Sequence, residues 1–498
     1  MTLVNKTMFP LNNSIRNITS MKTVFDKLQL QLATGEKATN LAEMGSDRYF
    51  DLGLRQRIAR IEAYESNITT VGIRLSTLDT TLSRIDEIES DARAAAVSGI
   101  GGSEKVNLAT FPTLAASRLD EVLSLLNTDV NGRYLFGGST TETPPVASGD
   151  AVLNGANGKA GLKQLVSERR LADLGTGNMG RLAVTSATDT VTLAEDGVHP
   201  FGLKLSTAVS STSAITVSPP AGSPPQQTIQ FGATLPVAGD TVSISVVLPD
   251  GTEDQIVLTA SNDPSAPGTF QIGADPDATA ASFAAALTAS IQQFATTDLA
   301  SASAFAAADD FFYGQGESAM RVDGPPFETA TAQVVGTSAD TVLWYTGEDS
   351  ANPRKTVIAK VGEGTSIDYG VQANEGGIAR LVRTLGAVAA QSFPDGDATS
   401  EARFTAMASR NASRLAENNS DSSSIAAITV ELGLASASAG QVAERHTAYK
   451  AQLTNMLDEI ETAVPEEVAM QILALKTRLE ASYQTTSMLS QLSLVNYI

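Results

Sequence analysis

Side chains that commonly carry out catalysis or bind metals are few in this sequence, and their spacing matches no familiar site. Cysteine is absent, and His199 and His446 are the two histidines. We therefore expect no thiol nucleophile, no thiolate metal site and no cluster of histidine ligands. Gly99–Lys105 lacks the spacing of a phosphate-binding loop, and Asp395–Asp397 with Glu401 lacks the EF-hand pattern. The sequence predicts a protein that is not an enzyme and needs neither a cofactor nor a metal.

Composition and charge indicate which kinds of molecule this chain is not expected to bind. The chain has 498 residues, of which 42% are hydrophobic and 18% charged, so it can bury several cores. Its 55 acidic and 34 basic residues give a formal net charge of −21. Duplex nucleic acid and anionic lipid both require clustered Lys and Arg, so we expect neither nucleic acid nor a membrane as a partner. The first residues lack the continuous apolar run of a secretory signal, and no membrane span is expected.

A long helix is predicted near the start of the chain, over residues 52–97. Apolar residues recur there at alternating spacings of three and four, the heptad pattern of helices that pack side by side. Such a helix is about 69 Å long and needs partner helices along its length. The residues predicted to form this seam are Ile61, Tyr64, Ile68, Val71, Leu75 and Leu78.

A matching seam lies near the other end of the chain, over residues 428–463. The simplest interpretation is that the two long helices pack on each other, although heptads also suit an ordinary coiled-coil dimer. A third helix is predicted at about 103–130 and is expected to end at Asn131-Gly132. The second half of the bundle seam comprises Leu432, Val442, Tyr449, Leu453 and Met456.

The two terminal segments are amphipathic as well. Pro465, followed by two glutamates, predicts a helix start, because proline suits the first helical turn and acids favour its positive end. We expect the apolar seams of both segments to lack partners until neighbouring molecules supply them. The residues of this candidate assembly interface are Ile15, Ile18, Phe25, Leu28, Leu32, Ile472, Leu475, Leu479, Leu489 and Leu492.

The middle of the chain, residues 139–370, is rich in Thr, Ser, Gly and Pro. Alternating apolar residues around the turn Pro249–Thr252 predict a hairpin, and 278–294 reads as an amphipathic helix, so an α+β unit is expected near 180–315. The predicted fold class is α+β and multidomain, with a long helical coiled-coil bundle formed by both chain ends. The expected domains are terminal helices (1–40 and 465–498), a bundle (41–138 and 371–464) and the inserted β-rich region (139–370).

Several motifs in this order resemble the bacterial flagellin family. Leu28–Lys37 resembles the family's Thr-Gly-Lys segment, and the Tyr64-x-x-Asn67 pair is similar to the helix that follows it. Asn131–Gly138, Asn-Gly-Arg-Tyr-Leu-Phe-Gly-Gly, resembles a turn of the hook–filament junction branch, and the last 20 residues resemble that branch's C-terminal helix and tail. The resemblance covers roughly 1–140 and 400–498, about half the chain.

The resemblance implies a structural, self-assembling subunit of the extracellular flagellum that serves motility. It implies type III export as an unfolded chain without a cleaved signal. The expected partners are copies of itself, hook-associated protein 1, flagellin and an export chaperone. Two departures from the family pattern leave the assignment to the junction branch open. The middle region is large for a junction subunit, and Glu43–Asp47 replaces the family's Asp-Asp-Pro stretch. A filament-forming flagellin is the first alternative, and a secreted adhesin with a helical stalk is a more distant one.

Overall fold

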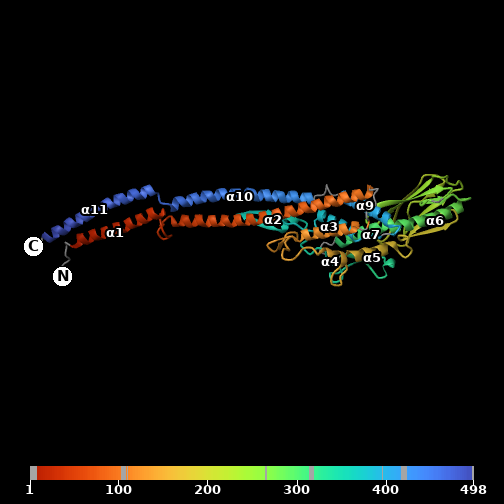
Figure 1. Cartoon of the computed structure of the whole chain (residues 1–498), viewed down its shortest axis with the longest axis horizontal. Helices are drawn as coiled ribbons and strands as arrows, with labels where there is room; N and C mark the ends of the chain where they lie inside the picture. The colour runs from red at the N-terminus through yellow and green to blue at the C-terminus, as the bar shows by residue number, and fades with distance from the viewer. Residues whose placement is uncertain are drawn as a thin grey trace. The chain divides into compact units, whose positions relative to one another are not determined.

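The structure is a computed structural model that describes residues 8–101, 108, 110–263, 266–312, 319–394, 396–416 and 423–495 (Figure 1). It confirms the α+β class, with long helices at both chain ends and small sheets between them. The residues form two compact units. The first unit contains residues 1–70, 360–366 and 438–498, and the second contains 71–359 and 367–437. The boundaries between the two units fall within α2 (Arg48–Gly101) and α10 (Ile425–Glu461), the two long helices.

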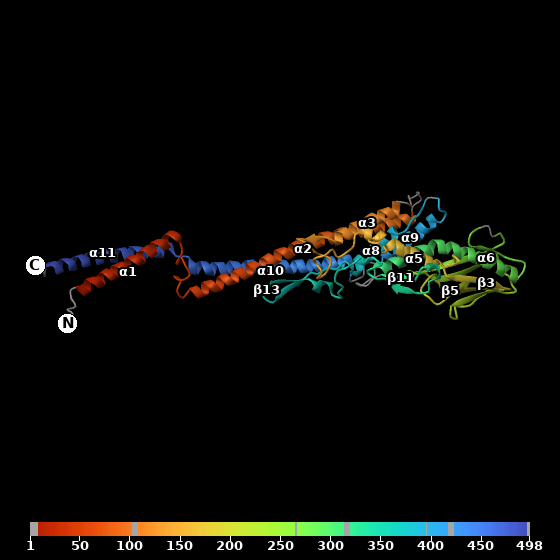
Figure 2. The ribbon, with the colours of Figure 1, turned by 90° about the horizontal axis from the view of Figure 1, so that it is seen from below.

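The first unit is built almost entirely from helices. It holds α1 (Met8–Thr34), α11 (Pro465–Val495), the first part of α2 (Arg48–Gly101) and the last part of α10 (Ile425–Glu461). α11 begins at Pro465 and carries Glu466 and Glu467 in its first turn, which confirms the predicted helix start. Figures 1 and 2 both show α1 beside α11.

The bundle seam of the first unit joins α2 to α10. Leu54, Ile61 and Leu453 form a buried cluster, and Leu457 and Ile460 pack against it. On the last turns of α10 the seam follows a different register from the one expected. Tyr449 and Met456 are exposed at the surface, by 42% and 46%. The adjacent positions Lys450 and Leu457 are less exposed instead, because the seam steps by four and then three after His446.

By length and composition, α10 is also apolar enough to cross a membrane, with a mean hydropathy of 1.3 over 18 residues. The sequence analysis expected no stretch with the length and hydropathy of a membrane span, and α10 meets these two criteria. Five α10 seam residues nevertheless pack within the protein, and this helix–helix packing accounts for the apolar stripe. They are Ile428, Leu432, Ala439, Val442 and Leu453.

The second unit has a helical core. It combines the later part of α2 and the first part of α10 with α3 (Thr110–Leu126), α4 (Gly149–Asn154), α5 (Leu162–Leu174), α7 (Ala300–Phe312), α8 (Gly376–Ala389) and α9 (Ser400–Ala416). One continuous cluster of buried side chains joins these helices. It includes the predicted seam residues Val71, Leu75, Leu78 and Leu432. α8 is buried along most of its length, so the helices around it enclose it on several sides.

The third predicted helix ends earlier than expected. α3 stops at Leu126, and Asn131-Gly132 instead forms the turn between β1 (Asp129–Val130) and β2 (Arg133–Tyr134). Both turn residues have positive φ, 55° and 75°, which is the geometry that Asn-Gly adopts in two-residue hairpins. The Asn-Gly pair therefore marks a hairpin and not a helix end.

A two-sheet domain with one covering helix is inserted in the second unit. One sheet has the order β3 (Leu182–Ala187), β4 (Thr190–Glu195), β7 (Gln226–Phe231), β6 (Ile215–Val217). The other has the order β10 (Thr269–Gln271), β9 (Glu253–Ser261), β8 (Thr241–Val247), β5 (Lys204–Ser210). Their inner residues and α6 (Pro276–Phe294) share one core. The predicted hairpin is β8–β9, and its strands pair in antiparallel register.

Short elements complete the middle region. A π-helical turn, η1 (Ala295–Leu299), leads into α7, and the 3₁₀ turns are η2 (Phe327–Thr329) and η3 (Pro353–Thr356). Two more hairpins are β11 (Met320–Val322) with β12 (Gln333–Val335), and β13 (Ile358–Gly362) with β14 (Thr365–Asp368). Residues 342–345, all of them described, form no strand. Trp344 is buried nonetheless and donates to the carbonyl oxygen of Phe312 at 2.8 Å.

Candidate assembly interface

The two terminal helices, α1 and α11, lie side by side and run antiparallel within the first unit (Figures 1 and 2). Leu28 of α1 is buried together with Ala463 and Val468, and Ile472 and Leu475 pack against this cluster. The expectation that these seams lack partners within the chain is therefore wrong for Leu28, Ile472 and Leu475. Each helix supplies the partner surface for the other, because both carry apolar residues at helical spacing.

The remaining expected interface residues are less covered. Ile15 and Leu32 are exposed by 49% and 46%, whereas Ile18, Phe25 and Leu479 are half-buried. Leu489 and Leu492 lie in the helical backbone of α11, and their side chains fall outside the described residues. The structure thus brings together the inner half of the predicted interface and leaves Ile15 and Leu32 open to solvent.

A second set of apolar residues on these helices was missed by the sequence analysis. Met470, Leu473 and Met488 on α11 are exposed by 65%, 64% and 60%. At 100° per residue, Met470 and Met488 lie on the opposite side of the helix from Ile472 and the rest of its buried face. A search for one heptad seam passes over such apolar residues on the other side of the helix, because polar residues such as Thr477 and Gln484 separate them. Val24, Leu30 and Tyr483 add to the exposed apolar surface.

Backbone hydrogen bonds join the base of the helix pair. Gly35, with φ of +75°, ends α1, and its carbonyl oxygen accepts from the amide of Ala463 at 2.8 Å. The amide of Lys37 donates to the carbonyl oxygen of Glu461 at 2.7 Å, and Glu36 and Thr462 form an isolated β-bridge. The turn after α1 and the turn before α11 therefore hold each other in register.

A charged cluster supports this base. Arg55 donates to Asp51 at 3.1 Å and also to Glu461, and the Asp51 side chain is fully buried. Hydrogen bonding with Asp51 raises the pKa of the Glu461 carboxyl, and burial raises it further, while Arg55 opposes both effects. Two carboxylates thus share one guanidinium at the point where α10 ends.

Farther along the first unit, α2 and α10 hold the tip of the β13–β14 hairpin. Tyr64 and His446 are stacked, with ring centroids 5.7 Å apart. His446 Nε2 lies 2.7 Å from the carbonyl oxygen of Val361, so this nitrogen carries the proton and donates. Asn67 donates to the carbonyl oxygen of Lys360 at 3.3 Å. The seam histidine is thus a packed structural residue that ties the hairpin to the helices.

An exposed aromatic pair lies at the start of α2. Tyr49 and Phe50 are exposed by 82% and 63%, and their rings meet edge to face with centroids 6.0 Å apart. Leu52 on the next turn is exposed by 44%. Contiguous exposed aromatic and aliphatic groups are typical of surfaces that contact other proteins.

The remaining candidate chemical groups have structural partners. His199 bonds to Asp196 at 2.6 Å, and Asp397 accepts from Thr399 and pairs with Arg403. Within the described residues, no group of three or more His, Cys, Asp or Glu side chains converges as a metal site. Asp395 and residues 102–105 of the glycine-rich segment lie outside the described residues.

The helical region and its turn match a known family. Residues 4–141, which include α1, α2, α3 and the β1–β2 turn, match the bacterial flagellin N-terminal helical region. The N-terminal part of this chain is therefore similar to that region of the bacterial flagellins, in line with the resemblance.

One solved structure to which the chain is similar is the flagellar hook-associated protein 3 of Legionella pneumophila. The two are 14% identical, with a TM-score of 0.24, over 88% of this chain and 98% of that one. No curated relative matches the chain.

Proposed function

We propose that this chain is a self-assembling structural subunit of the bacterial flagellum, exported by the type III route and assembled outside the cell through its terminal helices. The observation that carries the proposal is the exposure of three large apolar side chains of α11, Met470, Leu473 and Met488, on a helix whose other face is already packed on α1. Among the described residues, these three side chains are left exposed.

The free energy of burial explains why copies would associate. Fully burying a Leu or Met side chain contributes about 1.5–3 kcal/mol relative to leaving it exposed. Several such side chains on each copy, repeated around a ring or tube, favour helix-to-helix contact between neighbours. In this assembly Ile15, Leu32, Met470, Leu473 and Met488 contact neighbouring copies, and Leu28, Ile472 and Leu475 keep the pair within each copy together.

Within the family, we favour the junction between hook and filament, with hook-associated protein 1 and flagellin as neighbours and a chaperone for export. The support is the Asn131–Gly138 motif and the C-terminal tail, whose residue patterns resemble that branch. A filament flagellin remains the second candidate, because the inserted two-sheet domain from Leu182 to Phe294 is a large outer domain of the kind expected on a filament.

A variant series tests the assembly step. Replacing Met470, Leu473 and Met488 together by Ser should abolish polymers of the purified protein in sedimentation and electron microscopy, while circular dichroism stays unchanged. The matched control replaces three equally exposed valines of the inserted domain, Val198, Val209 and Val237, by Ser. Polymers of the α11 variant equal to those of the control would overturn the proposal.

Immunogold electron microscopy on flagellated cells separates the two branches. An antibody against residues 180–315 should label a single band beyond the hook if the chain is the junction subunit. Label along the whole filament would make the chain a flagellin, and label on the cell surface away from flagella would favour the adhesin.

A further inference from the structure

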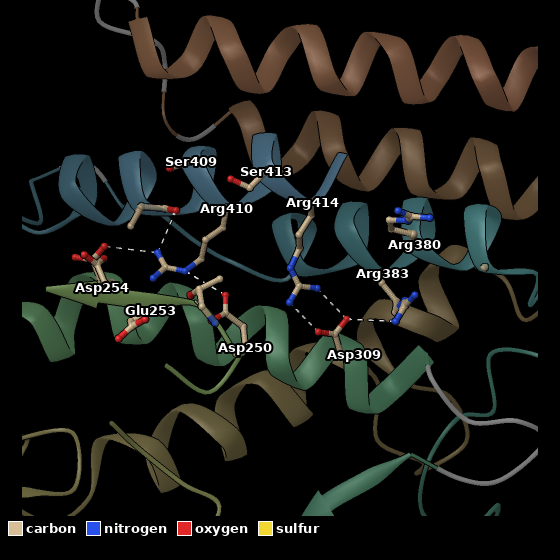
Figure 3. A pocket seen from close by; sticks show the side chains of 15 residues that line it. Asp250, Glu253, Asp254, Asp309, Arg380, Arg383, Ser409, Arg410, Ser413 and Arg414 are labelled. Atoms are coloured by element: carbon tan, nitrogen blue, oxygen red, sulfur yellow. Dashed lines mark hydrogen bonds and ion pairs between the residues drawn. The ribbon is translucent and has the colours of Figure 1, made fainter. Parts of the chain in front are cut away.

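Two cavities of the second unit differ in whether their polar groups have partners. The larger, of about 740 Å³, is polar, and several charged residues of its lining bind one another (Figure 3). Arg410 pairs with Asp250 and Asp298, and Arg414 pairs with Asp309. The smaller, of about 80 Å³, lies between α2, α3, α8 and α9 and has in its lining a buried polar atom without a partner among the described residues. The smaller cavity is therefore the candidate ligand site.

The walls of the smaller cavity are mostly apolar. Leu385 and Val388 of α8 form a buried side, whereas Leu114 of α3 is exposed by 51%, so the cavity reaches the surface near Leu114. Asp91 and Arg118 also line the cavity and are paired with each other at 3.3 Å. An apolar group inside the cavity therefore contacts apolar side chains on most sides. The other apolar lining residues are Ala92, Ala95, Phe111 and Ala115.

Asn411 of α9 is the exception on the buried side of the cavity. It is exposed by only 4%, and its Oδ1 makes no hydrogen bond within the described residues. Met407 and Leu415, one turn to either side on the same helix face, are apolar and fully buried. The face thus has the pattern of a helix core, in which an amide costs stability unless its oxygen receives a hydrogen bond. A ligand in the cavity can donate that bond.

Water alone is a poor partner for this amide. A water molecule takes about 30 Å³ in the liquid, so a cavity of about 80 Å³ has room for about two or three. Buried waters are usually held by about three polar partners each. Among the described lining residues, Asn411 alone offers a polar side chain on the buried side. Replacing such weakly held water by a group that is apolar except for one donor favours binding.

We propose that this cavity binds a small neutral group that has an apolar body and a single hydroxyl, of the size of a short-chain alcohol. The hydroxyl donates to Asn411 Oδ1, and the carbon body contacts Leu385 and Val388. A dry cavity of about 150 Å³ admits benzene, so a cavity of about half that volume is too small for an aromatic ring. A charged ligand is excluded because the buried side has no group of opposite charge among the described lining residues.

Two probes test whether Asn411 recognises the hydroxyl. 2-Propanol has the proposed chemistry, and xenon is an apolar probe of protein cavities. In methyl NMR titrations of the full chain, 2-propanol should shift the signals of Leu385 and Val388. Asn411→Ala removes the amide without filling the cavity, so the affinity for 2-propanol relative to that for xenon should fall at least about threefold, as expected for one lost hydrogen bond. Asn262→Ala, at an exposed asparagine outside the cavity, is the matched control and should leave this ratio unchanged.

Two results would overturn the proposal. The first is the absence of any shift of the Leu385 and Val388 signals with 2-propanol, and the second is an equal affinity ratio in the wild type and Asn411→Ala. A variant that leaves Asn411 in place tests the location separately. Ala92→Leu extends a larger side chain from a half-buried wall into the cavity and should block both probes. Binding of 2-propanol that is unchanged in Ala92→Leu would place the alcohol elsewhere and would also count against the site.

A third probe distinguishes two sources of the hydroxyl. N-Acetyl-threoninamide carries the same hydroxyl-bearing group on a peptide backbone. If it shifts the Leu385 and Val388 signals as strongly as 2-propanol does, the cavity accepts a hydroxyl side chain of another protein. If 2-propanol alone shifts them, the ligand is a free small molecule. The site lies in the second unit and does not involve the terminal helices, so this test is independent of the assembly proposal.

Discussion

His446 and Tyr64 lie stacked across the bundle seam, with their ring planes 17° apart, while His446 Nε2 donates to the carbonyl oxygen of Val361. Val361 is fully buried, so its carbonyl group has little access to water. The histidine therefore satisfies a backbone acceptor of the β13–β14 hairpin and fills the seam with a flat ring.

Replacing His446 by Phe preserves the ring and removes the donor. We expect a loss of about 1–2 kcal/mol in the free energy of unfolding, because the Val361 carbonyl group is left buried without its partner. Urea denaturation followed by circular dichroism measures this loss. Tyr449→Phe, at an exposed position one turn along α10, is the control and should change nothing. Equal stability of the two variants would show that the hydrogen bond is dispensable.

The stability of the second unit should depend on pH through Asp310. Burial raises the pKa of the Asp310 carboxyl to about 6, although Arg169 and Gln333 bond to it at 3.0 and 2.8 Å. Arg169 also bonds to the buried Asp173, so one guanidinium serves two carboxylates.

Because the folded-state pKa of Asp310 lies above the unfolded value, the folded protein binds the proton more tightly. This contribution to stability is fully present at about pH 4 and is lost as the pH rises through about 6. Asp310→Asn should remove this contribution. The free energy of unfolding of the wild type minus that of the variant should therefore fall by about 1–3 kcal/mol as the pH rises through that range, measured by urea denaturation at a series of pH values. A wild-type-minus-variant difference that rises with pH would contradict this assignment.

Gly180 should be intolerant of any side chain. Its φ is +61°, and a Cβ atom there would lie 2.9 Å from both Leu203 Cδ1 and Leu299 Cδ2. Gly180→Ala should therefore lower the free energy of unfolding by about 1–3 kcal/mol, through backbone strain and overpacking. Gly239→Ala is the control, because it shares a positive φ but has open space around it. If the two variants lose equal stability in thermal unfolding, then backbone strain alone is responsible.

Packing of the terminal helices should be separable from assembly. Ile472→Ala removes a contact between α11 and α1 and should cost about 1–2 kcal/mol, which hydrogen exchange would report as faster exchange in both helices. Met470→Ala, two residues earlier and exposed, should leave exchange in the monomer unchanged. Equal exchange in the two variants would mean that α1 and α11 do not protect each other in solution.

Periodicity sufficed to predict the long helices, because a heptad pattern and a proline at a helix start depend only on residues that are close together in the sequence. It could not show that Leu28 faces Ile472 and Leu475 within one chain, since a seam has the same pattern whether its partner is internal or a second copy. The shift from Tyr449 to Lys450 escaped prediction for another reason. Glu62 and Glu65 each lie 3.1 Å from Lys450 Nζ, and these charge contacts across the seam favour a basic residue where the heptad predicted an apolar one.

The larger, polar cavity of the second unit, lined by residues of 250–254 and of 380–414, could not be predicted from sequence patterns. These two segments lie more than 100 residues apart in the chain, and only the fold brings them together.

The inserted domain leaves the helical core at Leu174 and returns at Ala300, and α5 and α7 are neighbours joined by the Arg169–Asp310 ion pair. The insertion thus begins and ends at almost the same place on the scaffold. Evolution can exchange such a domain for another of different size without altering either chain end. The inserted domain can therefore diversify while both chain ends stay constant, and a foreign domain with adjacent termini can be grafted at the same site.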